Sequence, residues 1–185
     1  MMNPMAGTEA KPDTNNDAEQ IEMLVMDVDG VLTPGEIIYD SDGRELKRFS
    51  VRDGFGLSLW HKAGFGSAII TARGGPVVER RAEELGITHH MHHVADKGAA
   101  LEQLAQRTGV ATDRMAYIGD DWLDLSAMRR AGLAAAPSDA QQPVIEAAAW
   151  VGTKPGGRGV VRELVEYLLQ RKGLLAELLE GYDRP

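Results

Sequence analysis

The chain has 185 residues, no cysteine and a formal net charge of −8 at pH 7. Without cysteine it can hold no disulfide, thiolate metal site or cysteine nucleophile, and its negative charge argues against a nucleic acid as the main partner. No apolar run approaches the roughly 20 residues that cross a bilayer, so no membrane segment is expected. An anionic substrate would therefore need a bound cation or a local basic pocket.

The first 20 residues are rich in Asn, Asp, Thr and Pro and are expected to form a disordered tail. They lack the basic and apolar regions of a secretory signal, which favours the cytoplasm. Residues 21–27, IEMLVMD, form a short apolar run that predicts a buried parallel strand. Residues 36–40 and 45–50 flank the turn sequence SDGR, whose Asp-Gly pair predicts a β-hairpin over 36–50.

The remainder alternates between apolar strand patterns and helical patterns of about a dozen residues, which is typical of βαβ units and a parallel sheet. Strands are expected at 66–73, 87–94, 114–120, 132–137 and 148–152, and helices at 53–64, 76–86, 97–109, 121–132, 142–148 and, as one or two helices, 159–181. The pattern predicts one α/β domain over 21–172 and a C-terminal helix or tail over 173–185. In such sheets the active site lies at the carboxyl ends of the strands.

Asp27 and Asp29 follow the first strand in the sequence DVDGVLT. Alternation along a strand directs both side chains to the same side, and two carboxylates this close ionise together readily only beside a cation. A second acidic cluster, Asp120 and Asp121 with Asp124 one turn further, follows the strand AYI. These hard oxygen ligands favour Mg²⁺. Asp120 and Asp121 could also cap a helix, and the two roles are compatible.

Thr71 and Lys97 complete the predicted constellation. Thr71 closes a strand just before a helix that is expected to begin near Gly74, where a hydroxyl and backbone N–H groups could cradle phosphate. Lys97 starts the next helix and carries a point charge suited to a phosphoryl oxygen. Together these groups predict phosphoryl transfer, with Asp27 as nucleophile and Asp29 as acid and base.

A cluster of histidines, His89, His90, His92 and His93, suggests a metal site at first sight. Alternation along a strand sends neighbouring side chains to opposite faces, so the four cannot converge on one ion. We therefore expect an edge or partly buried strand here.

Four elements of the sequence resemble, in order, the four motifs of the haloacid-dehalogenase phosphatase superfamily. They are DVDGVLT, IITAR, Lys97 and GDDWLD. Three further segments, FSVRDGFG, ERRAEELGITH and KPGGRGVVRELVEYLL, are similar to the small branch typified by 3-deoxy-D-manno-octulosonate 8-phosphate (KDO 8-phosphate) phosphatases. The resemblance covers about residues 21–170. It implies a three-layer Rossmann-like core with a parallel sheet, no cap domain and a small β-hairpin insertion.

The resemblance also implies roles for individual residues. Asp27 would be the nucleophile and Asp29 the acid and base. Mg²⁺ would be held by Asp27, the Asp29 carbonyl and Asp120. Asp121 and Asp124 would lie near the ion. Thr71 and Lys97 would bind the phosphate.

For the substrate, the resemblance implies a cytoplasmic enzyme of lipopolysaccharide synthesis that acts on KDO 8-phosphate. Arg73 and Arg158 occupy the positions expected to meet a sugar-acid carboxylate, and Arg52 and Asp53 would lie beside the active site. Asp53 could instead be a plain helix N-cap. The branch implies a homotetramer in which hairpins such as 36–50 form a central barrel and a neighbouring subunit covers each active site.

Three other functions compete with this interpretation. The first is a phosphatase for another sugar-acid phosphate, such as a nonulosonate 9-phosphate, although arginine at positions 73 and 158 favours the eight-carbon substrate. The second is a phospho-accepting signalling receiver, which normally carries its phosphorylated Asp on a middle strand rather than in a first-strand Asp-x-Asp. The third is an inactive assembly protein, which no missing group supports.

Overall fold

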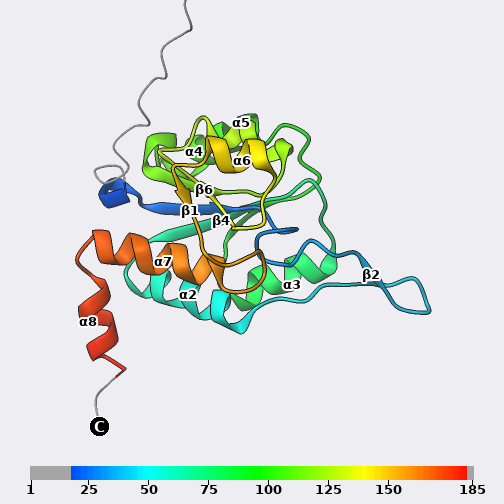
Figure 1. Cartoon of the computed structure of the whole chain (residues 1–185), viewed down its shortest axis with the longest axis horizontal. Coiled ribbons are helices and arrows are strands. Elements are labelled where there is room, and N and C mark those ends of the chain that lie inside the picture. The colour runs from blue at the N-terminus through cyan, green and yellow to red at the C-terminus, as the bar shows by residue number, and fades with distance from the viewer. Residues whose placement is uncertain (1–17, 183–185) are drawn as a thin grey trace, which may run out of the picture.

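The computed structural model describes residues 18–182 and forms three layers, with a parallel sheet between two layers of helices (Figure 1). The six-stranded sheet has the order β5-β4-β1-β6-β7-β8, and every neighbouring pair is parallel. Its strands are β1 (Met23–Met26), β4 (Gly66–Ile70), β5 (His89–Met91), β6 (Met115–Ile118), β7 (Leu133–Ala136) and β8 (Trp150–Val151). The helices are α2 (Val51–Lys62), α3 (Pro76–Glu84), α4 (Lys97–Thr108), α5 (Leu125–Met128), α6 (Gln142–Ala147), α7 (Val160–Arg171) and α8 (Leu175–Glu180), with 3₁₀ turns η1 (Thr112–Arg114) and η2 (Trp122–Asp124).

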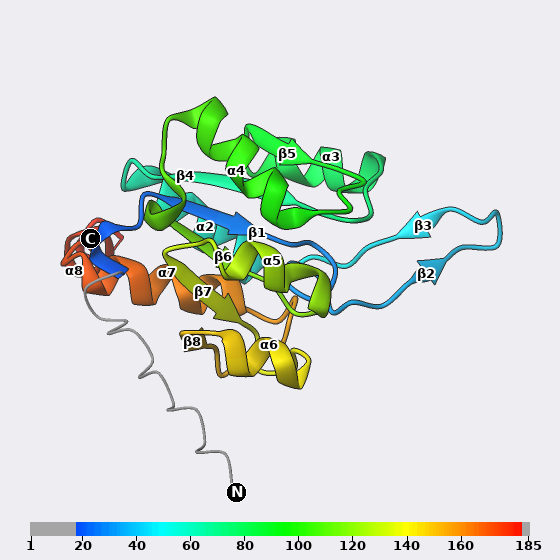
Figure 2. The same ribbon diagram turned by 90° about the horizontal axis from the view of Figure 1, so that it is seen from above.

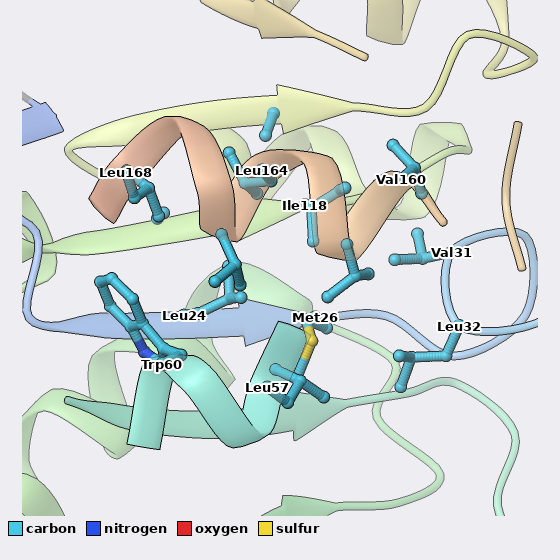
Figure 3. Close-up of a cluster of buried hydrophobic side chains, with 14 of the residues drawn as sticks. Leu24, Met26, Val31, Leu32, Leu57, Trp60, Ile118, Val160, Leu164 and Leu168 are labelled. Atoms are coloured by element: carbon cyan, nitrogen blue, oxygen red, sulfur yellow. The ribbon is translucent and has the colours of Figure 1, made fainter. Parts of the chain in front are cut away.

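Strand β1 shows why the chain forms these layers. All four of its residues are buried, and successive side chains alternate between the two faces of the sheet. Leu24 and Met26 belong to the core between the sheet and helices α2 and α7, together with Trp60 and Leu164 (Figure 3). Met23 and Val25 join a second core on the other face. Burial on both faces is what a continuous apolar strand predicts.

The fold predicted from the sequence is confirmed, including the absence of an inserted cap domain within residues 18–182. Helices α2, α3 and α7 cover one face of the sheet, and α4, α5 and α6 cover the other (Figure 1). None of the described helices is long and apolar enough to cross a membrane.

The hairpin expected over 36–50 projects away from the body of the molecule (Figure 2). Its paired portions are short, β2 (Ile38–Tyr39) and β3 (Glu45–Leu46), and they are antiparallel. The turn between them is stabilised by the Asp40 side chain, which accepts the backbone N–H groups of Asp42 and Arg44. Gly43 has a φ of +79°, which favours glycine at this turn.

Several predicted boundaries differ from the structure. The helix expected at 53–64 is α2, which begins earlier because Ser50, and not Asp53, accepts the first backbone N–H groups. The expected helix 121–132 divides into η2 and α5, and the expected strand 87–94 is shortened to β5. The last helical segment is two helices, α7 and α8, separated at Gly173, whose φ is +72°.

The predicted N-terminal tail, residues 1–20, extends three residues too far. Residues 1–17 lie outside the described residues, but residues 18–20 form a helical turn and Ala18 is buried in the core. At the other end of the chain, residues 183–185 also lie outside the described part.

Candidate active site

A cavity of about 240 Å³ opens at the carboxyl edge of the sheet. Its lining includes Asp27 and Asp29 after β1, Thr71 and Arg73 after β4, and Asp120 after β6. Strand β1 lies between β4 and β6, so these residues follow the carboxyl ends of three adjacent strands and lie together at one edge of the sheet. The cavity also contains Lys97, Asp121, Leu123 and Asp124.

The loop after β1 must pass unusually close to the loop after β6. Gly30 has a φ of +86°, and a Cβ placed on it would lie 2.0 Å from Asp120 Oδ2. Only glycine suits both the conformation and the approach. Asp27 is fixed just before this turn, because its backbone N–H donates to the Ile118 carbonyl at 3.1 Å and its Oδ1 accepts the Val28 N–H at 2.7 Å.

Lys97 is the cation at the centre of the site. It is the first residue of α4, is 1% exposed, and places Nζ 2.7 Å from Asp27 Oδ2 and 2.6 Å from Asp124 Oδ1. Burial by itself lowers the pKa of Lys97, but attraction to these two carboxylates and the hydrogen bonds to them outweigh burial and raise it. Lys97 is therefore an ammonium in the folded protein.

Asp124 is fully buried and holds the site together by accepting four hydrogen bonds. Lys97 and the hydroxyl of Tyr117 donate to Oδ1 at 2.6 and 2.7 Å. The backbone N–H groups of Asp120 and Asp121 donate to Oδ2 at 3.1 and 3.2 Å. Asp124 therefore positions both Lys97 and the loop that carries Asp120.

The acids of the site are short of positive charge. Burial, followed by repulsion from Asp124, raises the pKa of Asp27 to about 6, although Lys97 opposes the shift. Burial, followed by repulsion from Asp124 and Asp27, raises the pKa of Asp120 to about 8. Lys97 alone does not compensate the neighbouring carboxylates of Asp27, Asp120 and Asp124, so the site favours a further cation.

The donor atoms fit a hard divalent cation. Carboxylate oxygens of Asp27, Asp120 and Asp124 lie within 4.8 Å of one another. Asp120 Oδ1 is buried and has no hydrogen-bond partner among the described residues, and an all-oxygen set of this kind suits Mg²⁺. The Asp124 oxygens already accept four donors, so Asp27 and Asp120 are the side chains best placed to bind the ion. Asp121 is exposed and its Oδ1 accepts the Trp122 N–H at 2.6 Å.

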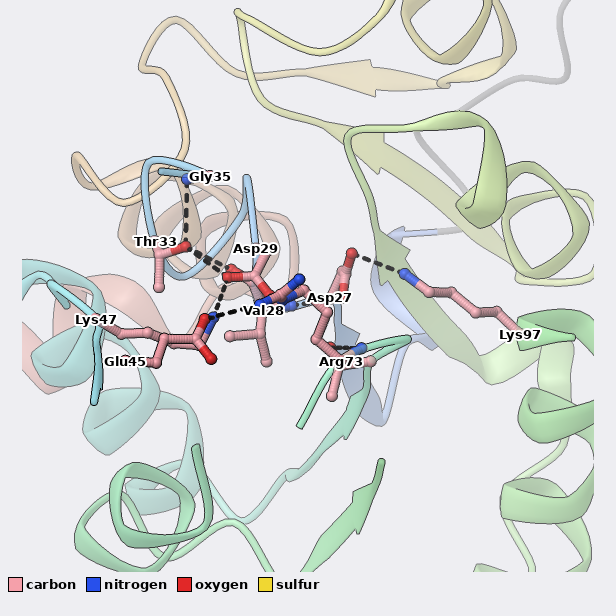
Figure 4. A network of polar contacts seen from close by, with 10 residues as sticks. Asp27, Val28, Asp29, Thr33, Gly35, Glu45, Lys47, Arg73 and Lys97 are labelled. Atoms are coloured by element: carbon pink, nitrogen blue, oxygen red, sulfur yellow. Dashed lines mark hydrogen bonds and ion pairs between the residues drawn. The ribbon is translucent and has the colours of Figure 1, made fainter. Parts of the chain in front are cut away.

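Asp29 contacts the hairpin as well as the cavity (Figure 4). Its Oδ1 forms an ion pair with Lys47, and its Oδ2 lies 3.8 Å from Arg73 Nε. Glu45 joins the two cations, with Oε1 3.1 Å from both Lys47 Nζ and Arg73 Nη2. The sequence interpretation missed Lys47 and Glu45. The available signal was their spacing of two residues on an extended strand, which puts both side chains on one side.

Thr71 is buried at the cavity wall, and its hydroxyl accepts the Arg73 N–H at 3.3 Å. Helix α3 begins at Pro76, as expected for the helix at 76–86, and two residues after Gly74. The chain therefore passes Thr71, Ala72 and Arg73 along the cavity before the helix starts.

The structure separates Arg52 and Arg158 from the Asp27 cavity. Together with Arg48 they line another hollow of about 330 Å³. The two hollows are close in the chain fold, because the Gly157 N–H donates to the Val31 carbonyl at 2.8 Å and packs this loop against the loop after β1.

Asp53 has a structural role, because it joins α2 to the beginning of α7. It is 1% exposed, and its two oxygens accept the backbone N–H groups of Gly159 and Arg162, each at 3.0 Å. Both acceptors are thus occupied at the start of α7, and Asp53 lines neither hollow.

The histidine cluster lies at the sheet edge, in agreement with the edge or partly buried strand expected there. Strand β5 is the edge strand, and none of its residues is fully buried. His90 Nδ1 and His92 Nε2 lie 2.9 Å apart and form a hydrogen bond with each other.

Comparison with known proteins finds relatives across most of the chain. Residues 70–164 match the family model described as haloacid dehalogenase-like hydrolase. The 3-deoxy-D-manno-octulosonate 8-phosphate phosphatase of Escherichia coli (strain K12) is 41% identical over 160 residues, which are 86% of this chain and 85% of that protein.

Solved structures agree with this relationship. The Moraxella catarrhalis 3-deoxy-D-manno-octulosonate 8-phosphate phosphatase, crystallised with a magnesium ion, a phosphate ion and KDO, aligns with a TM-score of 0.90 at 38% identity. That alignment covers 92% of this chain and 98% of the other. The corresponding Yersinia pestis enzyme aligns with a TM-score of 0.86 at 38% identity and covers 89% of each chain. The family resemblance predicted from the sequence motifs is confirmed.

Proposed function

The chain belongs to the haloacid dehalogenase-like hydrolases, and we propose that it is a Mg²⁺-dependent phosphatase that converts KDO 8-phosphate to KDO and phosphate. The observation that carries the proposal is the buried pair of Asp27 and Lys97 beside Asp120, in a chain 41% identical to a phosphatase of that name. Membership of a hydrolase family rules out the signalling receiver considered from the sequence.

In the first step a carboxylate oxygen of Asp27 attacks phosphorus, and the bond from phosphorus to the sugar oxygen breaks. Asp29 gives its proton to that leaving oxygen. Lys97 and the Thr71 hydroxyl bind the phosphoryl oxygens, where Lys97 offsets the charge that spreads over them. Because Lys97 is already held by Asp27 and Asp124, its position requires no rearrangement.

In the second step water attacks the phosphorus of the aspartyl-phosphate, and the bond to Asp27 breaks to release phosphate. Asp29, now a carboxylate, takes the proton from the water and is ready to act as the acid again. Mg²⁺ held by Asp27, the Asp29 carbonyl and Asp120 would neutralise phosphate charge when bound, and Asp121 and Asp124 would lie near it. The chain's own residues supply the nucleophile, the proton transfers and the lysine.

For the sugar acid, Arg73 is the best placed of the proposed recognition groups because it lines the Asp27 cavity and is 44% exposed. Arg158 and Arg52 line the neighbouring hollow and would meet a carboxylate only at the far end of an extended substrate. A role in lipopolysaccharide synthesis, in the cytoplasm, follows from this substrate and remains part of the proposal.

The protein would act as a homotetramer. The hairpin projects from the body (Figure 2) and exposes four large apolar side chains, Ile37, Ile38, Tyr39 and Leu46. An apolar group of this kind on a short exposed hairpin is typical of an interaction surface. A neighbouring subunit on this surface would also limit access to the cavity beside Arg73.

The test is phosphate release from KDO 8-phosphate, a nonulosonate 9-phosphate and a generic aryl phosphate, each with Mg²⁺ and with EDTA. We expect Mg²⁺-dependent release with the highest kcat/KM for KDO 8-phosphate. A higher value for the nine-carbon compound would replace the substrate but keep the chemistry. No release from folded protein with Mg²⁺ would refute the phosphatase. Light scattering of the same sample gives the oligomer size.

A further inference from the structure

Lys47 is a buried cation that the steps above do not use. Its side chain is 2% exposed, and it reaches the site from the strand end of the hairpin (Figure 4). Its Nζ forms an ion pair with Asp29 Oδ1 and lies 3.1 Å from Glu45 Oε1. A buried ammonium is costly unless it is paired. The two acids therefore compensate the buried charge of Lys47, and Lys47 in turn restrains the Asp29 carboxylate.

The two oxygens of Asp29 have different surroundings. Oδ1 accepts Lys47 and lies 3.4 Å from the Thr33 hydroxyl. Oδ2 is buried and has no hydrogen-bond partner among the described residues, and Arg73 Nε stands 3.8 Å from it. Arg73 is 44% exposed and can move away when a substrate enters. One oxygen of Asp29 is thus fixed, and the other keeps its lone pairs for a new proton donor.

We propose, on the basis of the proposed function, that Lys47 is a positioning residue for the hydrolysis of the aspartyl-phosphate. By holding Oδ1, Lys47 keeps the Asp29 carboxylate oriented so that Oδ2 accepts the proton of the attacking water. The water oxygen forms a bond to phosphorus, the bond from phosphorus to Asp27 breaks, and the proton moves to Asp29 Oδ2. No other reactant is required.

The end of β3 that carries Glu45 and Lys47 thereby contributes to the site, whereas the turn of the hairpin lies away from it (Figure 2). Glu45 fixes Lys47 from the same strand and also contacts Arg73, so the strand end, Asp29 and the loop after β4 are joined by one set of ion pairs. An ammonium donor on Oδ1 suits the carboxylate form of Asp29. That form exists after the first step, so loss of Lys47 affects the second step more than the first.

The experiment uses the full-length protein with Mg²⁺ and p-nitrophenyl phosphate. This substrate releases p-nitrophenolate when the aspartyl-phosphate forms, so stopped-flow absorbance separates formation (a burst) from hydrolysis (the steady state). Lys47→Met is expected to slow the steady state about tenfold, part of the ~10²–10⁴-fold contribution of a positioned acid–base group, with a burst of about the wild-type rate. Lys47→Arg keeps a cation on Asp29 and is expected to recover most of the loss.

Arg44→Met is the matched control. Arg44 lies on the same hairpin, is 71% exposed and, within residues 18–182, forms ion pairs with the hairpin acids Asp40 and Asp42 alone, so its removal should leave both phases unchanged. Glu45→Gln, which loosens Lys47 without removing it, is expected to give a smaller loss in the steady state.

Three results would overturn the proposal. An unchanged steady state in Lys47→Met would show that Asp29 needs no such support. Equal slowing of burst and steady state would indicate a general structural role. A raised KM for KDO 8-phosphate with unchanged phosphoenzyme hydrolysis would make Lys47 a substrate contact. Failure of the proposed function looks different, because the wild-type protein itself would then give neither burst nor phosphate.

Discussion

The Asp53 carboxylate accepts the backbone N–H of Arg162 at 3.0 Å, although the two residues are 109 positions apart in the chain. Asp53 belongs to α2 and Arg162 to the first turn of α7, and these helices lie on the same side of the sheet (Figure 1). A buried anion at the N-terminus of α7 satisfies N–H groups that have no partner within the helix and interacts favourably with the helix dipole. The contact joins two of the three helices that cover this face.

Asp53→Ala should therefore reduce stability rather than substrate recognition. Losing a helix cap costs about 0.5–2 kcal/mol, and the free energy of unfolding in urea should fall by about that amount. The kcat/KM of the folded variant should stay close to wild type. Asp42→Ala, at the exposed turn of the hairpin, is the control and should change stability by less than about 0.5 kcal/mol. A large rise in KM for Asp53→Ala, with little loss of stability, would restore the expectation of substrate contact.

The sequence predicts the positions of Asp27, Thr71 and Asp120 well because each follows an apolar strand. Adjacent parallel strands end at one edge, so a correct list of strands already brings these residues together. Lys97 is recognisable for the same reason, since it opens the helix that follows the next strand. Local pattern and sheet topology were sufficient for this part of the site.

The contacts of Lys47, Asp53 and Tyr117 could not be predicted in the same way. Lys47 reaches Asp29 only because the hairpin leaves the body at a particular angle, which no local pattern fixes. A local capping rule suggests Asp53 as the N-cap of its own helix, but Ser50 has that place and the partners of Asp53 lie at a helix far along the chain. Tyr117 reads as an apolar strand residue, and only the fold brings its hydroxyl 2.7 Å from Asp124.

Asp27→Asn should abolish turnover, because an amide is a poor nucleophile and no aspartyl-phosphate can form. We expect kcat for KDO 8-phosphate to fall by more than about 1000-fold, as for removal of a nucleophile in other enzymes. Steady-state phosphate release with Mg²⁺, together with acid-quench detection of phosphoenzyme, measures both effects. Asp42→Asn on the hairpin should match wild type. Turnover at the wild-type rate would exclude Asp27 as the nucleophile.

Lys97→Met should destabilise the metal-free protein strongly. The ammonium lies between Asp27 and Asp124, and removing it leaves two buried carboxylates without compensation. Breaking a buried ion pair from one side costs about 3–5 kcal/mol, and urea unfolding in EDTA should show a loss of that order. Mg²⁺ should recover part of the loss because it would supply charge beside Asp27. Lys62→Met, at an exposed position of α2, should change stability by less than about 0.5 kcal/mol. Equal stabilities of wild type and Lys97→Met would contradict this account.

Metal-free protein should become less stable as pH rises towards about 8. The pKa values of Asp27 and Asp120 are raised to about 6 and about 8, so the folded state keeps protons that the unfolded state has already lost. Stability associated with these groups is fully present at low pH and is lost as pH rises through their folded pKa values. Mg²⁺ binds the ionised acids, so the stabilisation by Mg²⁺ should grow over the same range.

Thermal unfolding in EDTA and in Mg²⁺, at several pH values between about 5 and 9, measures this effect. Asp120→Asn should flatten the pH dependence in EDTA and reduce the response to Mg²⁺, because it removes the acid with the highest pKa in the site. A metal-free Tm that rises steadily across this range would mean that Asp27 and Asp120 are ionised throughout it.

Arg158→Ala tests whether the second hollow recognises the sugar acid. Arg158 lies there with Arg48 and Arg52, outside the cavity that contains Asp27, so its loss should leave phosphoryl transfer intact. If the substrate carboxylate reaches this hollow, the variant should raise KM for KDO 8-phosphate by about 10-fold or more, since a hydrogen bond to a charged group contributes about 1.5–3 kcal/mol. The KM for p-nitrophenyl phosphate, which has no carboxylate, should hardly change.

The matched variant Arg73→Ala decides between the two candidate positions. Arg73 lines the Asp27 cavity and also contacts Glu45 and Asp29, so its loss should affect sugar-acid binding if the carboxylate stays near the phosphate. A selective KM effect in Arg158→Ala alone would place the carboxylate in the second hollow, and one in Arg73→Ala alone would place it beside Asp29. Equal changes for both substrates in both variants would mean that neither arginine reads the carboxylate, because loss of a carboxylate contact cannot affect a substrate that lacks one.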